Sequence, residues 1–460
     1  MFLKDVPQLK SAKVTVMGLG LFGGGVGVVE FLAKNGTRVT VTDLKTKKEL
    51  AKSLSRLKGL PVTYYLGAHI KKDFTDCDFV VVNPAVQLDS PFIRYAIKAG
   101  VPLETEMNLF FKLCKGRIIG ITGSNGKTTT TALVGEILKR SNKKTWVGGN
   151  IGKSLLENTS RIKPSDLVVL ELSSFQLDNL GRISRSPNIA VVTNISPNHL
   201  DRHKTMRNYI AAKQEILKYQ KAGDWACLNA DDATVTKYFK PPRGINLLKF
   251  STKKVSVPIF SKGDYIYIMG KRLNVSSRKL LGWFNLENMC AASAAYLAAC
   301  NGKLAEISAL ESVFNGFKGV EHRLEFVRSI NGVKFYNDSI ATNPKSTIEA
   351  LNALPGDIIL IAGGYDKKLS FDELADIIDS RVKMLLLIGQ TADKILGLVR
   401  QRNGGLPILK CNSMDKAVRN AFINAVPGNT VLLSPACASY DMFTNFTERG
   451  KLFKKLVSDI

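Results

Sequence analysis

The chain has 460 residues, 45% of them hydrophobic and 37 of them glycine, and is therefore long enough for about two to four domains with buried cores. Lysine and arginine number 65 against 39 acidic residues, and the resulting charge of +26 favours anionic ligands such as nucleotides and phosphorylated substrates. The basic residues are spread along the whole chain, without blocks or a basic–aromatic repeat, so nucleic-acid binding is the weaker interpretation.

The seven cysteines are scattered, odd in number and never at CxxC spacing, which favours reduced thiols in the cytoplasm over structural zinc or disulfides. Lys4, Asp5 and Lys10 interrupt the N-terminus before the apolar core of a signal peptide could form. No run of about eighteen apolar residues occurs, so we expect no membrane insertion and a cytoplasmic location.

The first expected strand leads into a glycine-rich turn with the pattern Gly18-x-Gly20-x-x-Gly23. A helix is expected to about Asn35, and a second strand over 38–42 ends at Asp43. This arrangement is typical of Rossmann-like nucleotide-binding domains, in which the acid accepts hydrogen bonds from a sugar or base. Because the pattern occurs in many α/β proteins, it indicates a bound nucleotide more strongly than NAD.

Residues 118–131 predict a strand, a glycine-rich turn and a helix in direct succession, an arrangement that binds phosphate. Lys127 can reach the β- and γ-phosphates, and the hydroxyl of Thr128 or Thr129 can bind Mg²⁺. The strict P-loop spacing requires a glycine at the position of Ile121, and a glycine turn followed by a surface lysine is the alternative interpretation. We predict that ATP is bound by Gly123, Ser124, Asn125, Gly126, Lys127, Thr128 and Thr129.

Two further expected strands of the central region end in polar residues. The apolar stretch 166–171 ends in Glu171, which is the Walker-B pattern for a metal-holding carboxylate. The stretch 189–194 is followed shortly by His199 and His203. Ligands of open α/β sheets bind at such strand ends, so the two histidines indicate a site.

Lys213 lies in an expected helix over 209–218, four residues after Tyr209, and from its spacing alone it would be a solvent-exposed helix lysine. Beyond this helix, the alternating pattern of 247–275 predicts a small β insertion. Residues 284–301 predict an alanine-rich helix.

After a linker near 316–319, expected strands alternate with expected helices. The strands are 333–336, 358–362, 383–388 and 430–433. This alternation predicts βαβ units and a mostly parallel sheet. The loops 337–339, 363–367 and 434–439 follow strand ends, and we expect them to share one cleft edge.

The sequence therefore predicts an α/β protein with three domains. These are a Rossmann-like N-terminal domain over 1–106, a central P-loop ATPase-type domain with a parallel sheet over 107–319, and a Rossmann-like C-terminal domain over 320–460. Three cores joined by short linkers lead us to expect a monomer whose last domain moves.

Short motifs in all three regions resemble those of the Mur ligases, the ATP-dependent amino-acid ligases of peptidoglycan synthesis. The matching stretches are 20–23, 122–128, 148–152, 171–177, 198–203, 322–323, 337–339, 434–439 and 445–446. The phosphate-binding motif is common to all Mur ligases and to folylpolyglutamate synthases. In contrast, 171–177 and 434–439 are similar to the members that add D-glutamate.

The resemblance implies a ligase that adds D-glutamate to UDP-N-acetylmuramoyl-L-alanine at the expense of ATP. ATP would convert the substrate carboxylate into an acyl phosphate, which the amine of D-glutamate attacks through a tetrahedral intermediate. The three domains would then bind the UDP-substrate, ATP and the amino acid in chain order. No nucleic-acid partner is implied.

The resemblance also assigns metal ligands for two Mg²⁺ ions. Thr128, Glu171 and His199 match such ligands, and Lys213 matches a lysine that CO₂ carbamylates into an anionic ligand. Carbamylation requires a neutral amine and hence a desolvated lysine with a lowered pKa. The implied catalytic residues are Lys127, His199 and Lys213.

The remaining contacts follow residue by residue from the same motifs. Further ATP contacts are implied for Asn288 near the adenine and for Arg323 and Asp338 near phosphate and ribose. UDP-substrate contacts are implied for Gly20, Leu21, Phe22, Asp43, Asn83, Asn150 and Ser173. D-Glutamate contacts are implied for Thr342, Lys367, Ser439 and Phe446.

The chain departs from the family pattern in three places: Asn83-Pro84-Ala85 stands for Ser-Pro-Gly, Ile340 for a lysine, and Phe22 for a small polar residue. Another Mur-type ligase or a folylpolyglutamate synthase is the alternative within the class. A diaminopimelate- or lysine-adding member should contain Asp-Asn-Pro-Arg, which the sequence lacks, and a folylpolyglutamate synthase would lack the first domain with Asp43. A nucleic-acid motor would need helicase motifs, which are also absent, and a non-catalytic NAD-binding module would not need a metal site.

Overall fold

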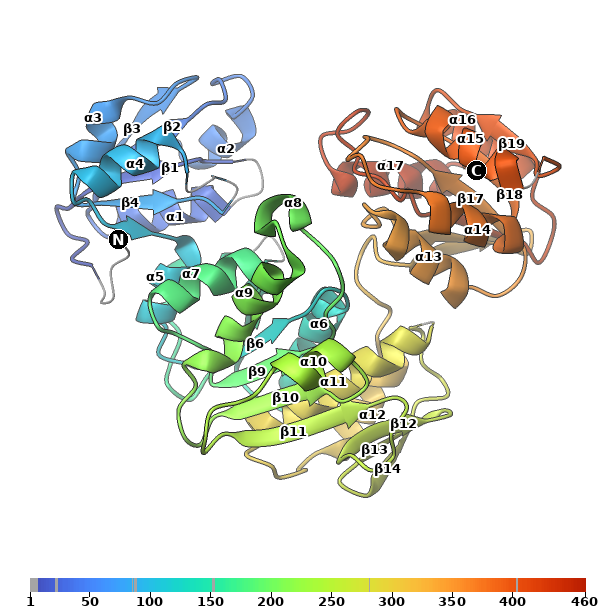
Figure 1. Cartoon of the computed structure of the whole chain (residues 1–460), viewed down its shortest axis with the longest axis horizontal. Coiled ribbons are helices and arrows are strands. Elements are labelled where there is room, and N and C mark those ends of the chain that lie inside the picture. Colours follow the sequence, from blue (N-terminus) through green and yellow to red (C-terminus); the bar gives the residue numbers. More distant parts are fainter. Residues whose placement is uncertain are drawn as a thin grey trace. The chain divides into compact units, whose positions relative to one another are not determined.

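The structure is a computed structural model of the chain (Figure 1), and it describes residues 7–20, 24–84, 86, 89–150, 154–280, 282–402 and 404–460. The chain divides into two compact units, Met1–Ser276 with Leu286–Phe314, and Ser277–Asn285 with Asn315–Ile460. Three mostly parallel sheets, each accompanied by helices, confirm the predicted α/β fold class. The domain limits at 106 and 319 stay predictions.

The first sheet is drawn in blue in Figure 1 and contains five parallel strands in the order β3-β2-β1-β4-β5. Its strands are β1 (Lys13–Met17), β2 (Arg38–Asp43), β3 (Val62–Leu66), β4 (Phe79–Val82) and β5 (Leu103–Glu104). Its helices are α1 (Gly24–Lys34), α2 (Ala51–Arg56), α3 (Lys71–Thr75) and α4 (Pro91–Lys98), and α5 (Glu106–Leu113) follows. The central strand β4 is a continuous apolar run, and its neighbour β1 is buried from its second residue onward, because helices cover both faces of such a sheet.

The second sheet belongs to the same unit and has nine strands in the order β14-β13-β12-β11-β10-β9-β6-β8-β7. Its strands are β6 (Arg117–Thr122), β7 (Thr145–Gly149), β8 (Leu167–Glu171), β9 (Ile189–Val192), β10 (Trp225–Asn229), β11 (Asn246–Ser251), β12 (Ile259–Lys262), β13 (Tyr265–Ile268) and β14 (Lys271–Asn274). The last two strands pair antiparallel and extend the sheet edge, which confirms the predicted β insertion.

The helices after β6 begin with α6 (Lys127–Arg140) and a short 3-10 turn (Leu156–Asn158). They continue with α7 (Ser174–Arg182), α8 (Leu200–His203), α9 (Met206–Lys218), α10 (Ala233–Tyr238), α11 (Trp283–Ala299) and α12 (Ile307–Gly316). Among the helices of the described residues, none has the length and apolar character needed to cross a membrane.

The third sheet, orange to red in Figure 1, has six strands in the order β15-β16-β20-β17-β18-β19. Its strands are β15 (Glu325–Ile330), β16 (Val333–Asn337), β17 (Ile358–Ala362), β18 (Val382–Leu387), β19 (Ile408–Lys410) and β20 (Thr430–Leu433). Among the described strands of this sheet, β15 alone pairs antiparallel. The helices are α13 (Pro344–Ala353), α14 (Asp372–Arg381), α15 (Ala392–Arg402), α16 (Met414–Ile423) and α17 (Phe446–Ser458).

Parallel pairing brings the carboxyl ends of neighbouring strands to one edge of each sheet. In the second sheet, β6 lies between β8 and β9, so the segments that follow these three strands meet there. In the third sheet, β20 lies between β16 and β17, which gathers the loops 337–339, 363–367 and 434–439. Tyr365 donates its backbone N–H to the carbonyl of Ala438 at 2.9 Å, and the hydroxyl of Ser434 donates to Asp338 at 2.8 Å, so the three loops lie at one edge of the sheet as predicted.

Candidate active site

The turn between β6 and α6, residues 123–126, is the predicted phosphate turn, and it requires glycine at two positions. Gly126 has φ +80°, and a Cβ there would lie 2.1 Å from Oδ1 of Asn288. Gly123 has φ +154°, and a Cβ there would lie 1.9 Å from Oγ1 of Thr193. Side chains at either position would collide with the elements packed behind the turn. Ile121, which occupies the glycine position of the strict motif, is a fully buried core residue of β6.

Lys127 begins α6 and folds back over the turn. Its Nζ donates to the carbonyls of Gly123 at 2.9 Å and Ser124 at 2.8 Å. The cation therefore lies beside the turn and the N-terminus of α6, where phosphate oxygens bind. Asn288, for which an adenine contact was expected, packs against the turn and accepts a hydrogen bond from the hydroxyl of Thr130 at 3.4 Å.

Glu171, at the end of β8, links the phosphate turn to the neighbouring loop. The hydroxyl of Thr128 donates to its Oε2 at 2.6 Å, and the amide of Asn150 donates to its Oε1 at 2.9 Å. Gly149 (φ +94°) allows the close approach, because a Cβ there would lie 2.3 Å from the carbonyl of Glu171. A hydroxyl and a carboxylate thus lie together beside the turn, and such oxygen donors suit Mg²⁺.

The expectation that Lys213 is a solvent-exposed helix lysine is wrong. The side chain lies on the buried face of α9, and the residue is 2% exposed. Its Nζ donates to the carbonyl of Gly123 at 2.8 Å and to Oγ1 of Thr122 at 3.1 Å. Burial lowers the pKa of Lys213 well below its usual value, the nearby cation of Lys127 lowers it further, and Glu171 opposes both effects.

The two histidines after β9 lie around one aromatic ring of α7. Phe175 stacks on His203 with ring centroids 5.0 Å apart, and His199 meets the same ring at 5.3 Å. Nε2 of His203 shares a hydrogen bond of 2.9 Å with the hydroxyl of Ser174. His199 is exposed and has φ +53°. Within the described part of the chain, no three His, Cys, Asp or Glu side chains gather as a metal site.

Ser173, expected to contact the muramoyl portion, is the N-cap of α7. Its hydroxyl accepts from the N–H of Gln176 at 3.3 Å, and the side chain of Gln176 accepts from the N–H of Ser173 at 2.9 Å. This reciprocal capping box orients the first turn of α7, which carries Ser174 and Phe175. Ser173 therefore has a structural role in capping α7, and its substrate contact stays a prediction.

In the first sheet, Asp43 organises the glycine turn. Its Oδ2 accepts from the N–H groups of Leu19 at 2.9 Å and Gly20 at 3.2 Å, and its Oδ1 accepts from Lys45 at 2.9 Å. The amide of Asn83 donates to the carbonyl of Gly18 at 3.2 Å, so this residue also lies at the turn. The predicted positions Leu21 and Phe22 lie outside the described residues, as do Gly23, Ala85, Ile151 and Gly152.

In the second unit, Asp338 is buried at the end of β16. Its Oδ2 accepts from the hydroxyl of Ser434 at 2.8 Å and its Oδ1 from the N–H of Leu324 at 3.0 Å. Burial raises the pKa of Asp338 to about 7, against the hydrogen bond from Ser434 and the charge of Arg323. Carboxyl groups whose pKa is raised to near 7 occur often at ligand and catalytic sites.

The other residues assigned to this unit differ in exposure. Oγ of Ser439 and Nε of Arg323 are buried and make no hydrogen bond within the described part of the chain. Such atoms normally find a partner, so both suit a bound polar ligand. Thr342 is half-buried, and Lys367 is exposed on the loop after β17. The carbonyl of Phe446 accepts from the hydroxyl of Ser339 at 2.8 Å.

Sequence reasoning missed three polar residues around these loops, the half-buried Asn194 and the buried Glu287 and Arg449. Asn194 and Glu287 lie behind the phosphate turn and are joined by a hydrogen bond of 3.1 Å. Arg449 donates to the carbonyls of Ser339 and Cys437 and to the hydroxyl of Ser339. Arg449 lies one helical turn after the motif at 445–446, and this position is the sequence feature that could have indicated its role.

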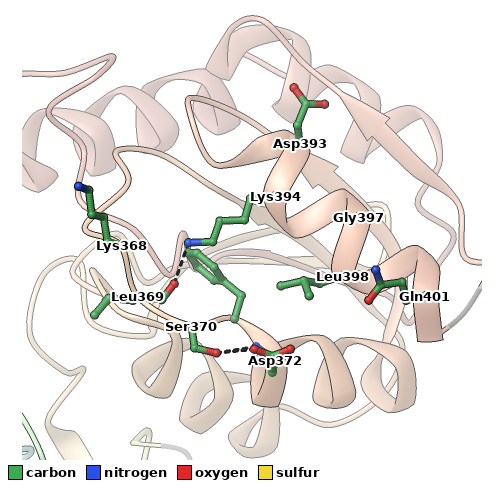
Figure 2. A pocket seen from close by; sticks show the side chains of 10 residues that line it. Lys368, Leu369, Ser370, Asp372, Asp393, Lys394, Gly397, Leu398 and Gln401 are labelled. Atoms are coloured by element: carbon green, nitrogen blue, oxygen red, sulfur yellow. Dashed lines mark hydrogen bonds between the residues drawn. The ribbon is translucent and has the colours of Figure 1, made fainter.

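A shallow depression of about 610 Å³ lies between the start of α14 and α15 (Figure 2). Lys394 crosses it, donating to the carbonyl of Leu369 at 3.0 Å and lying 5.2 Å from the ring centre of Phe371. Ser370 donates to Asp372 at 2.6 Å. None of the lining residues is a predicted site residue.

Comparison with protein families gives three consecutive matches. Residues 12–104 match the Mur ligase MurD-like N-terminal domain, residues 121–296 the Mur ligase middle domain, and residues 322–437 the Mur ligase glutamate ligase domain. The fold and these matches define the chain as a Mur ligase.

Curated relatives narrow the family further. A UDP-N-acetylmuramoylalanine–D-glutamate ligase of Acetivibrio thermocellus is 41% identical, over 98% of this chain and 97% of the relative. One of Clostridium tetani is 43% identical, over 99% of this chain and 100% of the relative. The chain belongs to the family of UDP-N-acetylmuramoylalanine–D-glutamate ligases.

Solved structures share the fold at lower identity. The UDP-N-acetylmuramate-alanine ligase MurC of Thermotoga maritima has a TM-score of 0.65 and 19% identity, covering 97% of this chain and 99% of its own. The MurF ligase of Thermotoga maritima, solved in complex with ADP, has a TM-score of 0.60 and 17% identity, covering 92% and 95%. At this identity they support the three-sheet architecture alone.

Proposed function

We propose that the chain adds D-glutamate to UDP-N-acetylmuramoyl-L-alanine with ATP, as a step of peptidoglycan synthesis. The observation that carries the proposal is the group of Lys127, Thr128, Glu171 and Lys213 at adjoining strand ends. It occurs in a chain whose relatives, at 41–43% identity and nearly full length, are named for this activity. Both nucleotide substrates are cytoplasmic metabolites, which supports a cytoplasmic enzyme.

The chemistry requires activation, because a carboxylate does not accept an amine at a useful rate. The carboxylate of the muramoyl-alanine substrate attacks the γ-phosphorus of ATP, and ADP leaves. The neutral amine of D-glutamate then attacks the acyl carbon, and the tetrahedral intermediate expels phosphate to leave an amide. Lys127, beside the phosphate turn, holds the transferred group in line and balances its charge.

The donors around Glu171 fit Mg²⁺, because a hydroxyl and a carboxylate oxygen lie 2.6 Å apart beside the phosphate turn. Thr128 and Glu171 would hold the ion, and His199 is a further proposed ligand. When bound, Mg²⁺ neutralises charge on the phosphate oxygens of ATP. Asn150 donates to the other oxygen of Glu171 and so fixes the carboxylate in place.

Lys213 is proposed to be carbamylated. A neutral amine adds to the carbon of CO₂ and loses one proton, which gives an anionic carbamate. The burial of Lys213 and its lowered pKa support this step, since both favour the neutral amine. The product would place a second anionic group beside Glu171 and turn this amine into a metal ligand.

The substrate contacts divide between the two units. In the first unit, Gly20, Asp43 and Asn83 lie at one glycine turn, and Asn150 and Ser173 lie near the end of β8, which supports their assignment to the UDP-substrate. In the second unit, the buried atoms of Arg323 and Ser439 support ligand contacts there, with Asp338 beside them. Thr342, Lys367 and Phe446 are proposed for D-glutamate, and Asn288 for ATP.

The test is phosphate release by the purified enzyme with ATP, Mg²⁺, UDP-N-acetylmuramoyl-L-alanine and a panel of amino acids. We expect release with D-glutamate and none with L-glutamate, L-lysine or diaminopimelate. The L-enantiomer is the matched control, because it carries the same charges in mirror-image geometry. Equal rates with both enantiomers, or no release with D-glutamate, would remove the proposed substrate.

A further inference from the structure

Asn194, just beyond the end of β9, is bonded to two successive residues of the phosphate turn. Its carbonyl accepts from the backbone N–H of Ser124 at 2.7 Å. Its side-chain Oδ1 accepts from the N–H of Asn125 at 2.8 Å, and its Nδ2 donates to the carbonyl of Asn125 at 3.3 Å. One residue therefore fixes both peptide groups in the middle of the turn.

Glu287, on α11, accepts a hydrogen bond from the amide nitrogen of Asn194 and so supports the orientation that the phosphate turn requires. The backbone N–H of Asn125 can only donate, so the side-chain atom that faces it must be the oxygen. The amide nitrogen then faces two acceptors, the carbonyl of Asn125 and Oε1 of Glu287, the second at 3.1 Å. Because Glu287 is buried, losing this acceptor would leave a donor without compensation by bulk water.

We propose that Asn194, oriented by Glu287, is a positioning residue for ATP. It binds the N–H groups of Ser124 and Asn125 and so fixes the backbone of the turn directly before α6. Phosphate binding then falls to the first turn of α6, whose N–H groups have no acceptor within the helix. The inference rests on the proposed function only in taking ATP as the ligand.

The test exchanges the donor and the acceptor between Asn194 and Glu287. In Asn194→Asp the second carboxylate oxygen faces the acceptors of Asn125 and Glu287, and we expect ATP affinity to fall roughly tenfold to hundredfold. In Asn194→Asp combined with Glu287→Gln, the new amide donates to the new carboxylate, and at least about tenfold of the loss should return. Glu287→Gln alone keeps an acceptor and should change ATP affinity by less than about threefold.

Asn188 provides a matched control at the opposite end of β9. Its Oδ1 accepts from the backbone N–H of Ile118 at 3.0 Å, and its Nδ2 donates to Asp224 at 3.3 Å. Asn188→Asp places a carboxylate oxygen against the carboxylate of Asp224, which is the same kind of conflict between two acceptors. It lies beside β6 and β9, as Asn194 does, but away from the phosphate turn. We expect a lower melting temperature with ATP affinity within about threefold of wild type.

The measurements are the affinity for a non-hydrolysable ATP analogue by calorimetry, KM for ATP and for D-glutamate, and the melting temperature. Asn194→Asp should raise KM for ATP and leave KM for D-glutamate unchanged. If this variant does not fold, Asn194→Ala, which removes the side-chain bonds without adding charge, should lose roughly tenfold in ATP affinity.

Unchanged ATP affinity in the folded Asn194 variants, an equal loss in Asn188→Asp, or no recovery in the double variant would overturn the inference. A wild-type protein that binds the ATP analogue without ligating D-glutamate would refute the proposed function. The calorimetric comparison would still decide the role of Asn194 in that case.

Discussion

Lys213 illustrates how a buried position changes the chemistry of one side chain. The residue is 2% exposed, and its amine donates to the carbonyl of Gly123 and the hydroxyl of Thr122. Removing an ammonium group from water disfavours its charged form, and the neighbouring cation of Lys127 adds to this effect. The lowered pKa favours the neutral amine that reacts with CO₂, whereas an ordinary surface lysine is protonated at neutral pH.

Lys213→Ala should lose roughly a hundredfold or more in the rate of phosphate release, because the proposed carbamate helps to hold the metal ion. A small carboxylate such as acetate should restore part of the rate by occupying the vacated space. In the wild type, ¹³CO₂ should give a carbamate carbon signal in NMR that disappears in the variant.

Lys218 is the matched control on the same helix, since it is exposed and paired with Glu215 at 2.8 Å. Lys218→Ala should keep nearly full activity and the carbamate signal. Full activity in Lys213→Ala would remove the carbamate from the mechanism.

Helix α17 is joined to two loops of the third sheet by one buried arginine. Arg449 donates to the hydroxyl and carbonyl of Ser339 and to the carbonyl of Cys437. Burial lowers its pKa to about 10, so the guanidinium stays charged at neutral pH. The planar fork of arginine matches these three acceptors, and a single ammonium group cannot reach all of them in the same geometry.

Arg449→Lys should destabilise the second unit by about 2–4 kcal/mol, because it leaves buried carbonyls without donors. Faster hydrogen exchange of the amides in β16 and β20, followed by mass spectrometry, would show the loss. Arg419→Ala, on the exposed face of α16, removes only a surface pair with Asp415 and should cost less than about 0.5 kcal/mol. Equal exchange in the two variants would contradict a structural role for Arg449.

At the scale of the whole molecule, the surplus of +26 coexists with buried carboxyl groups in both units. Burial raises the pKa of Glu287 to about 7, and nearby Asp231 and Asp232 act in the same direction, against hydrogen bonds from Asn194 and Asn229. In the second unit, burial likewise raises the pKa of Asp338 to about 7. Each acid therefore binds its proton more tightly in the folded chain than in the unfolded chain.

The sign of the pH dependence follows from these shifts. A raised carboxyl pKa contributes stability below the unfolded value, 4.5 for Glu287, and that contribution is lost as pH rises to about 7. Glu287→Gln cannot ionise, so its stability relative to wild type should increase by on the order of 3 kcal/mol between pH 4.5 and pH 8. Calorimetric unfolding across this range measures the difference, and parallel curves for the two proteins would count against a protonated Glu287.

The sequence determined the features that depend on neighbouring residues. Apolar runs predicted one or more inner strands of each sheet, such as β1, β6 and β17, whereas β3, β5, β7, β10, β15 and β19 were missed. In β15 and β19, polar and exposed positions interrupt the apolar pattern. The phosphate turn was predictable because its strand, glycines and helix follow one another within 118–131. In this segment the local backbone conformation itself forms the phosphate-binding site, so neighbouring residues suffice to predict it.

Tertiary structure decided which polar groups are buried and which meet. The burial of Lys213, the bond between Asn194 and Glu287, and the loops joined by Arg449 depend on segments about ninety or more residues apart. Solvent exclusion and hydrogen-bond partners arise only when parallel strands bring such segments to one edge. A side chain's identity fixes what it can donate or accept, whereas its charge and partner depend on what the fold places around it.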